Sequence, residues 1–274
     1  MTGSASAEAH PLGSRTTRRL ESAERAGIRA HLNLYALLQN LEELVRLDAQ
    51  AAEMVRGWDL TLQFAVRRGP AVSLEFAGGE CRCRWGHQPS PDISLYFASA
   101  RHLNAMFEGR AIPIPLRGFT RLGWLQNEFS RLTDRLEACL KPADPASCDA
   151  SDDLRAALLL QTAAFASCEL AMLEPTCRKI AGRIRDGVVT IESSPGAPTV
   201  HVIVSGSQFQ AVKSCDESPT SKLTFRDASM AVALLEGRLD PFEGLASGDL
   251  ALSGQIGMLD DFLLILDRVE AYLT

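Results

Sequence analysis

The sequence predicts an α+β protein of two pseudo-symmetric lobes, each a mostly antiparallel sheet covered by helices. The main support is an internal match: residues 95–113 read LYFASARHLNAMFEGRAIP, residues 223–241 read LTFRDASMAVALLEGRLDP, and 8 of the 19 aligned positions are identical. A second match joins 129–140 to 262–273, with 6 of 12 positions identical. The two offsets, 128 and 133 residues, far exceed the ~20–50 residues of solenoid repeats. The copied unit is therefore a whole small domain.

The two copies divide the chain into four parts. Residues 1–19 are rich in Ser, Thr, Gly and Ala and lack periodicity, so we expect a disordered tail there. Residues 20–141 form the first lobe and residues 151–274 the second. The Pro- and Asp-rich stretch 142–150 is the linker between them.

In the first lobe, apolar residues between Leu32 and Leu47 recur at spacings of three and four. This spacing predicts a helix that continues to about Val55 and ends at Gly57. Two prolines exclude a helix over 112–123. Alternating apolar and polar residues predict four strands in meander order, at 58–66, 72–77, 81–85 and 93–97, and helical spacing predicts two more helices, at 99–108 and 124–140.

The second lobe repeats this plan. Helical spacing extends from Leu154 to about Ile184, with a break at Pro175. The last helix carries five consecutive apolar residues, 262–266, which is more than one buried stripe needs, so a second face should contact the other lobe or a ligand. We expect strands at 188–192, 199–204, 207–213 and 222–225, and further helices at 228–236 and 258–273.

Charge and composition narrow the class of protein. The chain carries a net charge of −6, with +3 over residues 1–141 and −9 over residues 142–274. Nucleic acid is not expected as a partner, because phosphate binding needs a basic face. The asymmetry fits solvated surfaces, attraction between the lobes, or an anionic ligand head group in the first lobe. Seven scattered cysteines, no apolar run of ~18 residues and no signal-peptide core over 1–19 favour the cytoplasm.

A metal site is not expected. Cys81, Cys83 and His87 could suggest one, but we expect the two cysteines on opposite faces of a strand. Structural zinc sites commonly show two CxxC pairs, and the sequence has no such pair.

No catalytic residue or cofactor is predicted either. The sequence lacks the GxSxG, phosphate-loop, GxGxxG and HExxH motifs. Glu108 and Arg110 flank a glycine, and this pattern recurs at 236–238, so a shared helix cap or ion pair explains it better than catalysis. His102 aligns with Met230 and is specific to the first lobe, where we expect a half-exposed helical histidine.

The first lobe carries bulky apolar residues that either form a plain core or line a binding pocket. All three tryptophans lie in this lobe, and large rigid aromatics often line apolar sites. The candidate ligand-binding residues are Trp58, Leu62, Phe64, Leu74, Phe76, Tyr96, Phe97, His102, Leu103, Met106, Phe107, Trp124, Leu125, Phe129 and Leu132.

A family resemblance favours the pocket. Residues 236–254 read EGRLDPFEGLASGDLALSG, an apolar helix end, a Leu-Asp-Pro turn and a short SGxLxLxG strand before a last amphipathic helix. This stretch resembles the C-terminal signature of the sterol carrier protein type 2 family, over roughly 185–273. By the internal match the resemblance extends to 58–140, where the motif reads GRAIPIPLRG and the short strand is hard to see. The resemblance implies a sheet covered by helices, with an apolar tunnel for a lipid or similar ligand.

We therefore expect a carrier or pathway accessory protein that binds a hydrophobic small molecule, such as a lipid, acyl chain, isoprenoid or polyketide-like compound, mainly in the first lobe. The sequence does not decide whether the protein has a transient membrane or enzyme partner, or whether it forms a homo-oligomer. The alternative is a cofactor-independent cyclase or isomerase using the same cavity, which buried carboxyls at Asp59, Glu75 or Asp92 would favour. A third hypothesis is a scaffold whose pockets have closed.

Overall fold

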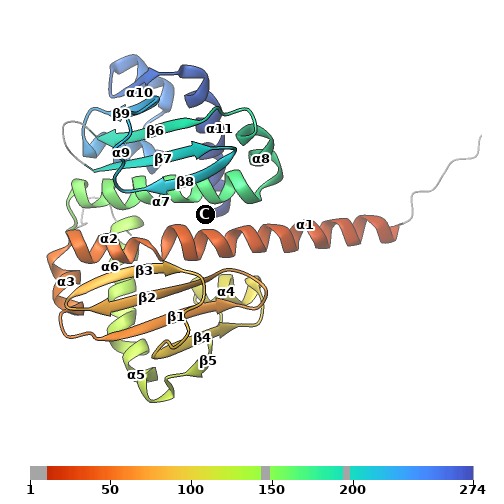
Figure 1. The fold of residues 1–274 in the computed structure, drawn as a ribbon, viewed down its shortest axis with the longest axis vertical. Coiled ribbons are helices and arrows are strands. Elements are labelled where there is room, and N and C mark those ends of the chain that lie inside the picture. The colour runs from red at the N-terminus through yellow and green to blue at the C-terminus, as the bar shows by residue number, and fades with distance from the viewer. Residues whose placement is uncertain (1–10, 143–148, 194–197, 274) are drawn as a thin grey trace, which may run out of the picture.

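The computed structural model describes residues 11–142, 149–193 and 198–273. Two five-stranded sheets lie at opposite ends of the molecule, and long helices run between them (Figure 1). The predicted two-lobe α+β fold is confirmed by this arrangement.

The first lobe contains the predicted elements and one additional strand, and it also forms helical turns from Phe119 onward, so the prolines exclude a helix only over the first part of 112–123. Helix α1 starts inside the predicted tail 1–19, and residues 1–10 lie outside the described residues. The strands are β1 (Leu60–Val66), β2 (Ala71–Ala77), β3 (Glu80–Trp85), β4 (Ile93–Phe97) and β5 (Ile114–Arg117). The helices are α1 (Pro11–Leu32), the π-helix η1 (Asn33–Leu37), α2 (Asn40–Leu47), α3 (Ala49–Val55), α4 (Ala100–Phe107), the 3₁₀-helix η2 (Phe119–Arg121), α5 (Leu122–Trp124), the π-helix η3 (Leu125–Phe129) and α6 (Ser130–Leu140).

The second lobe repeats this order and adds one helix, α10, before its last strand. Its predicted helix break falls at Pro175, the first residue of α8. The strands are β6 (Gly187–Ser193), β7 (Thr199–Ser205), β8 (Gln208–Val212), β9 (Ser221–Phe225) and β10 (Leu250–Gly254). The helices are α7 (Asp152–Leu173), α8 (Pro175–Ala181), α9 (Ala228–Leu235), α10 (Pro241–Ser247) and α11 (Ile256–Leu273).

The two sheets have the same topology. Their strand orders are β3-β2-β1-β4-β5 and β8-β7-β6-β9-β10. In each sheet the first and fourth strands of the lobe pair in parallel, and every other pair is antiparallel. An identical order with identical strand directions is what a duplicated domain should show.

The predicted meander is wrong at the fourth strand. β4 pairs with β1 and not with β3, because residues 86–92 carry the chain across the outer face of the sheet. The Gln88 backbone N–H donates to Oε1 of the buried Gln63 (2.8 Å), and Asp92 Oδ2 accepts from the Thr61 N–H (2.9 Å). Alternation along a sequence predicts strands but does not specify which strands pair.

The fifth strand of the first lobe, which was hard to see in the sequence, is present as β5. β5 is followed directly by Gly118, and β10 ends at Gly254, so IPLRG and LALSG are equivalent at an offset of 136 residues. Both glycines have positive φ, 83° and 87°. A Cβ on Gly118 would lie 2.8 Å from the Asp92 carbonyl oxygen, and one on Gly254 would lie 2.9 Å from Ser221 Cα and closer still to the Thr220 carbonyl oxygen. Only glycine fits where the last strand leaves the sheet.

Helix α7 lies at the centre of the molecule and is buried on all sides (Figure 1). Its Leu154 and Leu158 belong to the core of the first lobe. In return, Leu32 and Ala36 of the α1–η1 segment belong to the core of the second lobe. α7 is long and apolar enough to cross a membrane, but 83% of its most apolar window is buried inside the protein. Each lobe thus completes its core with a helix from the other.

The Glu-Gly-Arg pattern recurs for structural reasons. Glu108 pairs with Arg29 of α1 (2.5 Å) and with Arg110, while Glu236 pairs with Arg155 of α7 and with Arg238 (2.6 Å). These carboxylates hold the ends of α4 and α9 against the central helices. The expectation of a shared ion pair is confirmed.

Candidate functional site

The inner face of the first sheet presents a continuous apolar surface to the helices. Alternation places Leu62 and Phe64 of β1 on this face, and the register sets them opposite Leu74 and Val72 of β2. The deepest of the candidate residues, all at most 7% exposed, are Leu62, Phe64, Leu74, Phe76, Phe97, Leu103, Phe129 and Leu132. Together they form a packed core.

Aromatic rings gather at the margin of this core. Trp58 lies edge-on to Phe76 (4.9 Å between centroids) and to Trp124 (4.7 Å). Trp124 also lies 5.7 Å from Phe129. Trp58 and Trp124 are half-buried, as are Met106, Phe107 and Leu125, which pack against the same core. We call Trp58, Phe76, Trp124 and Phe129 the aromatic cluster.

The second lobe has no equivalent cluster, because small or aliphatic residues take two of the positions. Phe76 corresponds to Val204 at an offset of 128, and Trp124 corresponds to Gly257 at an offset of 133. Phe129 corresponds to Phe262, which is buried. The aromatic cluster is therefore a property of the first lobe alone.

The two lobes also cover their sheets differently. In the second lobe one continuous helix, α11, runs over Ile256–Leu273. In the first lobe the matching helical run, α5 to α6, is interrupted by the π-helical turn η3. π-Helical turns are rare and often occur at functional sites, and η3 carries Leu125 and Phe129 of the candidate set. We call residues 122–129 the broken cover.

Two candidate residues do not share the apolar interior. Tyr96 lies opposite Ala65 on the outer face, because its neighbours Leu95 and Phe97 take the inner face of β4. His102 bonds the backbone on both sides of its ring: Nδ1 lies 3.2 Å from the Ala98 N–H nitrogen and Nε2 lies 2.8 Å from the Ile112 carbonyl oxygen. The histidine therefore positions the segment that leads into β5.

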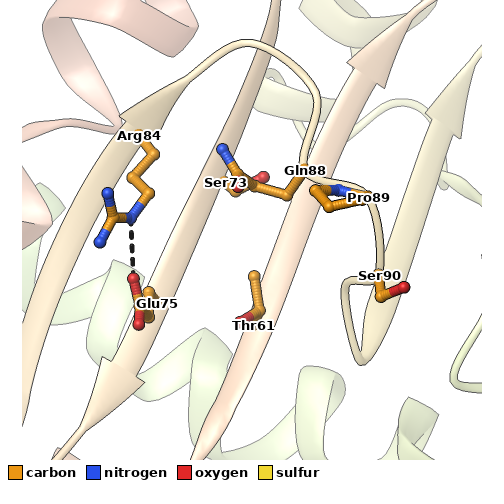
Figure 2. A pocket seen from close by; sticks show the side chains of 7 residues that line it. All are labelled: Thr61, Ser73, Glu75, Arg84, Gln88, Pro89 and Ser90. Carbon is orange, nitrogen blue, oxygen red and sulfur yellow. Dashed lines mark hydrogen bonds and ion pairs between the residues drawn. The ribbon is translucent and has the colours of Figure 1, made fainter.

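Two hollows lie on the outer, polar face of the first sheet, away from the aromatic cluster. Figure 2 shows the larger, a shallow depression of about 340 Å³ that contains the ion pair between Arg84 Nε and Glu75 Oε2 (2.8 Å). It is lined by Thr61, Ser73, Glu75, Arg84, Gln88, Pro89 and Ser90, and a smaller one of about 110 Å³ is lined by Glu75, Ala77, Glu80 and Arg82. None of the fifteen candidate residues lines either hollow.

The carboxyls that would have favoured catalysis lie outside the apolar interior. Asp59 and Asp92 are exposed. Glu75 lies on the outer face and is bound to Arg84. No carboxyl of this trio is placed to act on a substrate held by the aromatic cluster.

The expected orientation of the two cysteines is wrong. Residues two apart on a strand share a face, so Cys81 and Cys83 both point toward the core, while Arg82 between them is exposed. Burial raises the pKa of Cys83 to about 12 and that of Cys81 well above its ordinary value, so both stay protonated thiols. His87 is exposed, and no group of three or more His, Cys, Asp or Glu that could hold a metal occurs within the described ranges.

Sequence reasoning missed the exposed apolar residues around β5. Ile112, Ile114, Leu116 and Phe119 are all exposed. The signal was the alternation of Ile112, Ile114 and Leu116, hidden by the prolines between them.

The chain is similar to several solved structures but matches no protein family. No family model and no curated protein matches the chain. A UbiJ-SCP2 ubiquinone synthesis protein is similar at 17% identity over 35% of this chain and 82% of that chain, with a TM-score of 0.29. Sterol carrier protein 2 from Yarrowia lipolytica, in its apo form, is similar at 10% identity over 41% of this chain and 97% of that chain, with a TM-score of 0.31. Sterol carrier protein domain 2 of Helicoverpa armigera is similar at 17% identity over 38% and 83%, with a TM-score of 0.29.

The names of these structures match the resemblance found at 236–254. Their TM-scores lie below 0.5, so no ligand or activity is carried over from them. The two-lobe fold itself is established by the chain's own sheets.

Proposed function

We propose that the first lobe binds a hydrophobic small molecule, such as a lipid, acyl chain, isoprenoid or polyketide-like compound, and acts in the cytoplasm as a carrier or pathway accessory protein. The molecule would lie between the inner face of the first sheet and the broken cover. The observation that carries this proposal is the pairing of the aromatic cluster with a covering helix that a π-helical turn interrupts.

The interior is packed, so a ligand enters only when the cover moves. We infer that the covering helix opens first at η3, where the π-helical turn interrupts the regular α-helical hydrogen-bond pattern. Burying roughly 400 Å² of an acyl chain is worth about 10 kcal/mol, at ~25 cal/mol per Å². Micromolar binding requires about 8 kcal/mol. For micromolar affinity, the opening of the cover and the ligand's loss of freedom can together cost only about 2 kcal/mol.

The sequence signature adds independent support. The stretch 236–254 resembles the sterol carrier protein type 2 signature, and the IPLRG strand at 114–118 completes the same motif in the first lobe. The free thiols of Cys81, which is buried, and Cys83, which is half-buried, suit a reducing compartment.

Native mass spectrometry of the purified full chain tests the proposal, together with solvent extraction and displacement of a fluorescent fatty acid. We expect one ligand per chain and a recovered hydrophobic compound. Repeated recovery of empty protein, with no binding of the fluorescent fatty acid, would overturn the proposal.

A matched pair of variants locates the site. Trp124→Ala removes a ring of the aromatic cluster and should weaken fatty-acid binding at least about tenfold, because burying an aromatic side chain contributes on the order of 1.5–3 kcal/mol. Phe262→Leu alters the equivalent core of the second lobe and should leave the affinity unchanged. Equal losses in both variants would contradict a site in the first lobe.

A further inference from the structure

The segment 110–121 runs along the free side of the first sheet and exposes a row of large apolar side chains. We call this segment the first-lobe edge. Ile112 is 84% exposed, Ile114 43%, Leu116 58% and Phe119 63%. β5 is the outermost strand, at the end of the molecule away from the central helices (Figure 1). Exposed apolar side chains gathered in this way mark a docking surface.

The first-lobe edge is also basic. Arg110, Arg117 and Arg121 are exposed, and no Asp or Glu occurs between positions 109 and 127. Arg110 is paired with Glu108. Arg117 and Arg121 form no ion pair with any residue that the structure describes. Two free guanidinium groups therefore flank the apolar row, and the complementary partner is apolar and anionic.

The same edge is poorly suited to pairing with another strand. Pro113 and Pro115 supply no backbone N–H, and prolines on an edge strand discourage strand addition. A second copy would also bring Arg117 and Arg121 against basic residues of the same kind. Pairing through backbone hydrogen bonds is thus disfavoured for a protein partner or a second copy.

We propose that the first-lobe edge docks on the surface of a bilayer that contains anionic lipids. Ile112, Ile114, Leu116 and Phe119 enter the boundary between head groups and acyl chains, and Arg117 and Arg121 contact lipid phosphates and carboxylates. Docking at this place sets the membrane beside the broken cover, which follows the first-lobe edge and begins at Leu122.

The equivalent edge of the second lobe has the opposite character. Residues 239–257 contain Asp240, Glu243 and Asp249 and no Lys or Arg. Leu250 of β10 is buried, and α10 precedes that strand in the chain. α10 does expose Phe242 and Leu245, so it offers a matched control with apolar exposure but acidic charge.

Co-sedimentation of the full chain with vesicles tests the proposal. The vesicles contain phosphatidylcholine alone or phosphatidylcholine with phosphatidylserine. We expect binding to the anionic vesicles that weakens as salt rises, and little binding to the neutral ones. Each arginine contributes about fivefold, so Arg117→Gln with Arg121→Gln should lower the binding about 30-fold. Equal binding of this double variant and the unchanged protein would overturn the proposal.

Two further variants separate the apolar contribution from general stickiness. Ile112→Ser with Phe119→Ser should lower binding to anionic vesicles at least about tenfold, while Phe242→Ser with Leu245→Ser should leave it unchanged. Loss of binding in the second-lobe control, or a dimer in sedimentation velocity that disappears in the Ile112/Phe119 variant, would point to another use of the surface and overturn membrane docking.

Membrane docking and ligand binding are separate properties of the first lobe, and the experiments can disprove one without the other. The variants of the first-lobe edge should bind the fluorescent fatty acid like the unchanged protein when no vesicles are present. Circular dichroism and thermal unfolding check that each variant is folded. The substituted side chains are exposed, so we expect every variant to fold like the unchanged protein.

Discussion

The two lobes share a strand order and differ in what closes over it. In the second lobe a single helix, α11, covers an interior of largely aliphatic side chains. In the first lobe the equivalent helix is interrupted by the π-helical turn η3 above an aromatic cluster, beside an edge that is apolar and basic. Duplication kept the frame, and the segments that close over the two sheets differ most clearly along residues 110–129. We propose that the protein's specific function lies in that segment.

Both lobes keep the residues that the backbone conformation and the anchoring of the helices require. Gly118 and Gly254 leave the sheet with positive φ, and Glu108 and Glu236 anchor equivalent helices. Because these pairs are equivalent but not identically packed, each offers a quantitative test of the comparison.

The largest effect is expected at the strand-end glycines. A left-handed non-glycine residue costs about 1–2 kcal/mol, and overlap with the backbone adds to this cost. Gly254→Ala should lower the free energy of unfolding by at least about 3 kcal/mol, and Gly118→Ala by about 2 kcal/mol, because the added Cβ meets the backbone more closely at Gly254. Urea unfolding measures both values.

Gly123→Ala is the control for these variants. A Cβ at Gly123 meets nothing within 4 Å, and the residue lies in a helix, so the change should stabilise by about 0.5–1 kcal/mol. A Gly254→Ala variant as stable as the unchanged protein would show that the two strand ends are not built alike.

The next largest effect is expected at the two ion pairs that anchor α4 and α9, Arg29–Glu108 and Arg155–Glu236. Arg155 is 3% exposed and Glu236 15%, whereas Arg29 is 31% exposed and Glu108 24%. Arg155→Met leaves the largely buried Glu236 with only the exposed Arg238 and removes the hydrogen bond from Arg155 Nε to the Cys139 carbonyl oxygen (3.1 Å), so it should cost about 3 kcal/mol. Arg29→Met should cost about 1 kcal/mol or less. Adding Glu236→Gln to Arg155→Met should recover part of the loss. Equal costs for the two arginine variants would contradict the difference in burial.

The smallest effect is a pH dependence confined to the second lobe. Partial burial lowers the pKa of His201, whose position is taken by Ser73 in the first lobe. The unfolded chain then binds a proton more readily than the folded chain, so this contribution to stability is complete above about pH 6.5 and falls as the pH decreases. His201→Ser should flatten the decline in melting temperature between neutral pH and about pH 5.5. A decline of unchanged slope would contradict this assignment.

Much of the fold could be predicted because the sequence contains two versions of it. The recurrence of 95–113 marks the helix and strand of each lobe, and most strand bounds agree with the structure within two residues. β5 was hard to see because Pro113 and Pro115 mask its alternation. The pairing of β4 with β1 was missed because it depends on the crossover at 86–92, which periodicity does not encode.

The candidate site was predictable in composition but not in shape. Apolar side chains of the first lobe do converge on one core, since alternation and helical spacing determine which face each residue takes. Tyr96 was misplaced because aromatic character was weighed above that alternation. Whether an apolar interior is packed or hollow depends on side-chain volumes summed in three dimensions, and no pattern along the chain reports that sum.

The central claim is that the broken cover of the first lobe opens to admit a hydrophobic ligand, whereas α11 does not. Amide hydrogen exchange, followed by mass spectrometry with and without a long-chain fatty acid, tests it most directly. We expect peptides from 122–129 to exchange faster than those from 256–273 in the free protein, and to become protected when fatty acid is added, with no change over 256–273. Protection that appears only in α11, or nowhere, would contradict the claim.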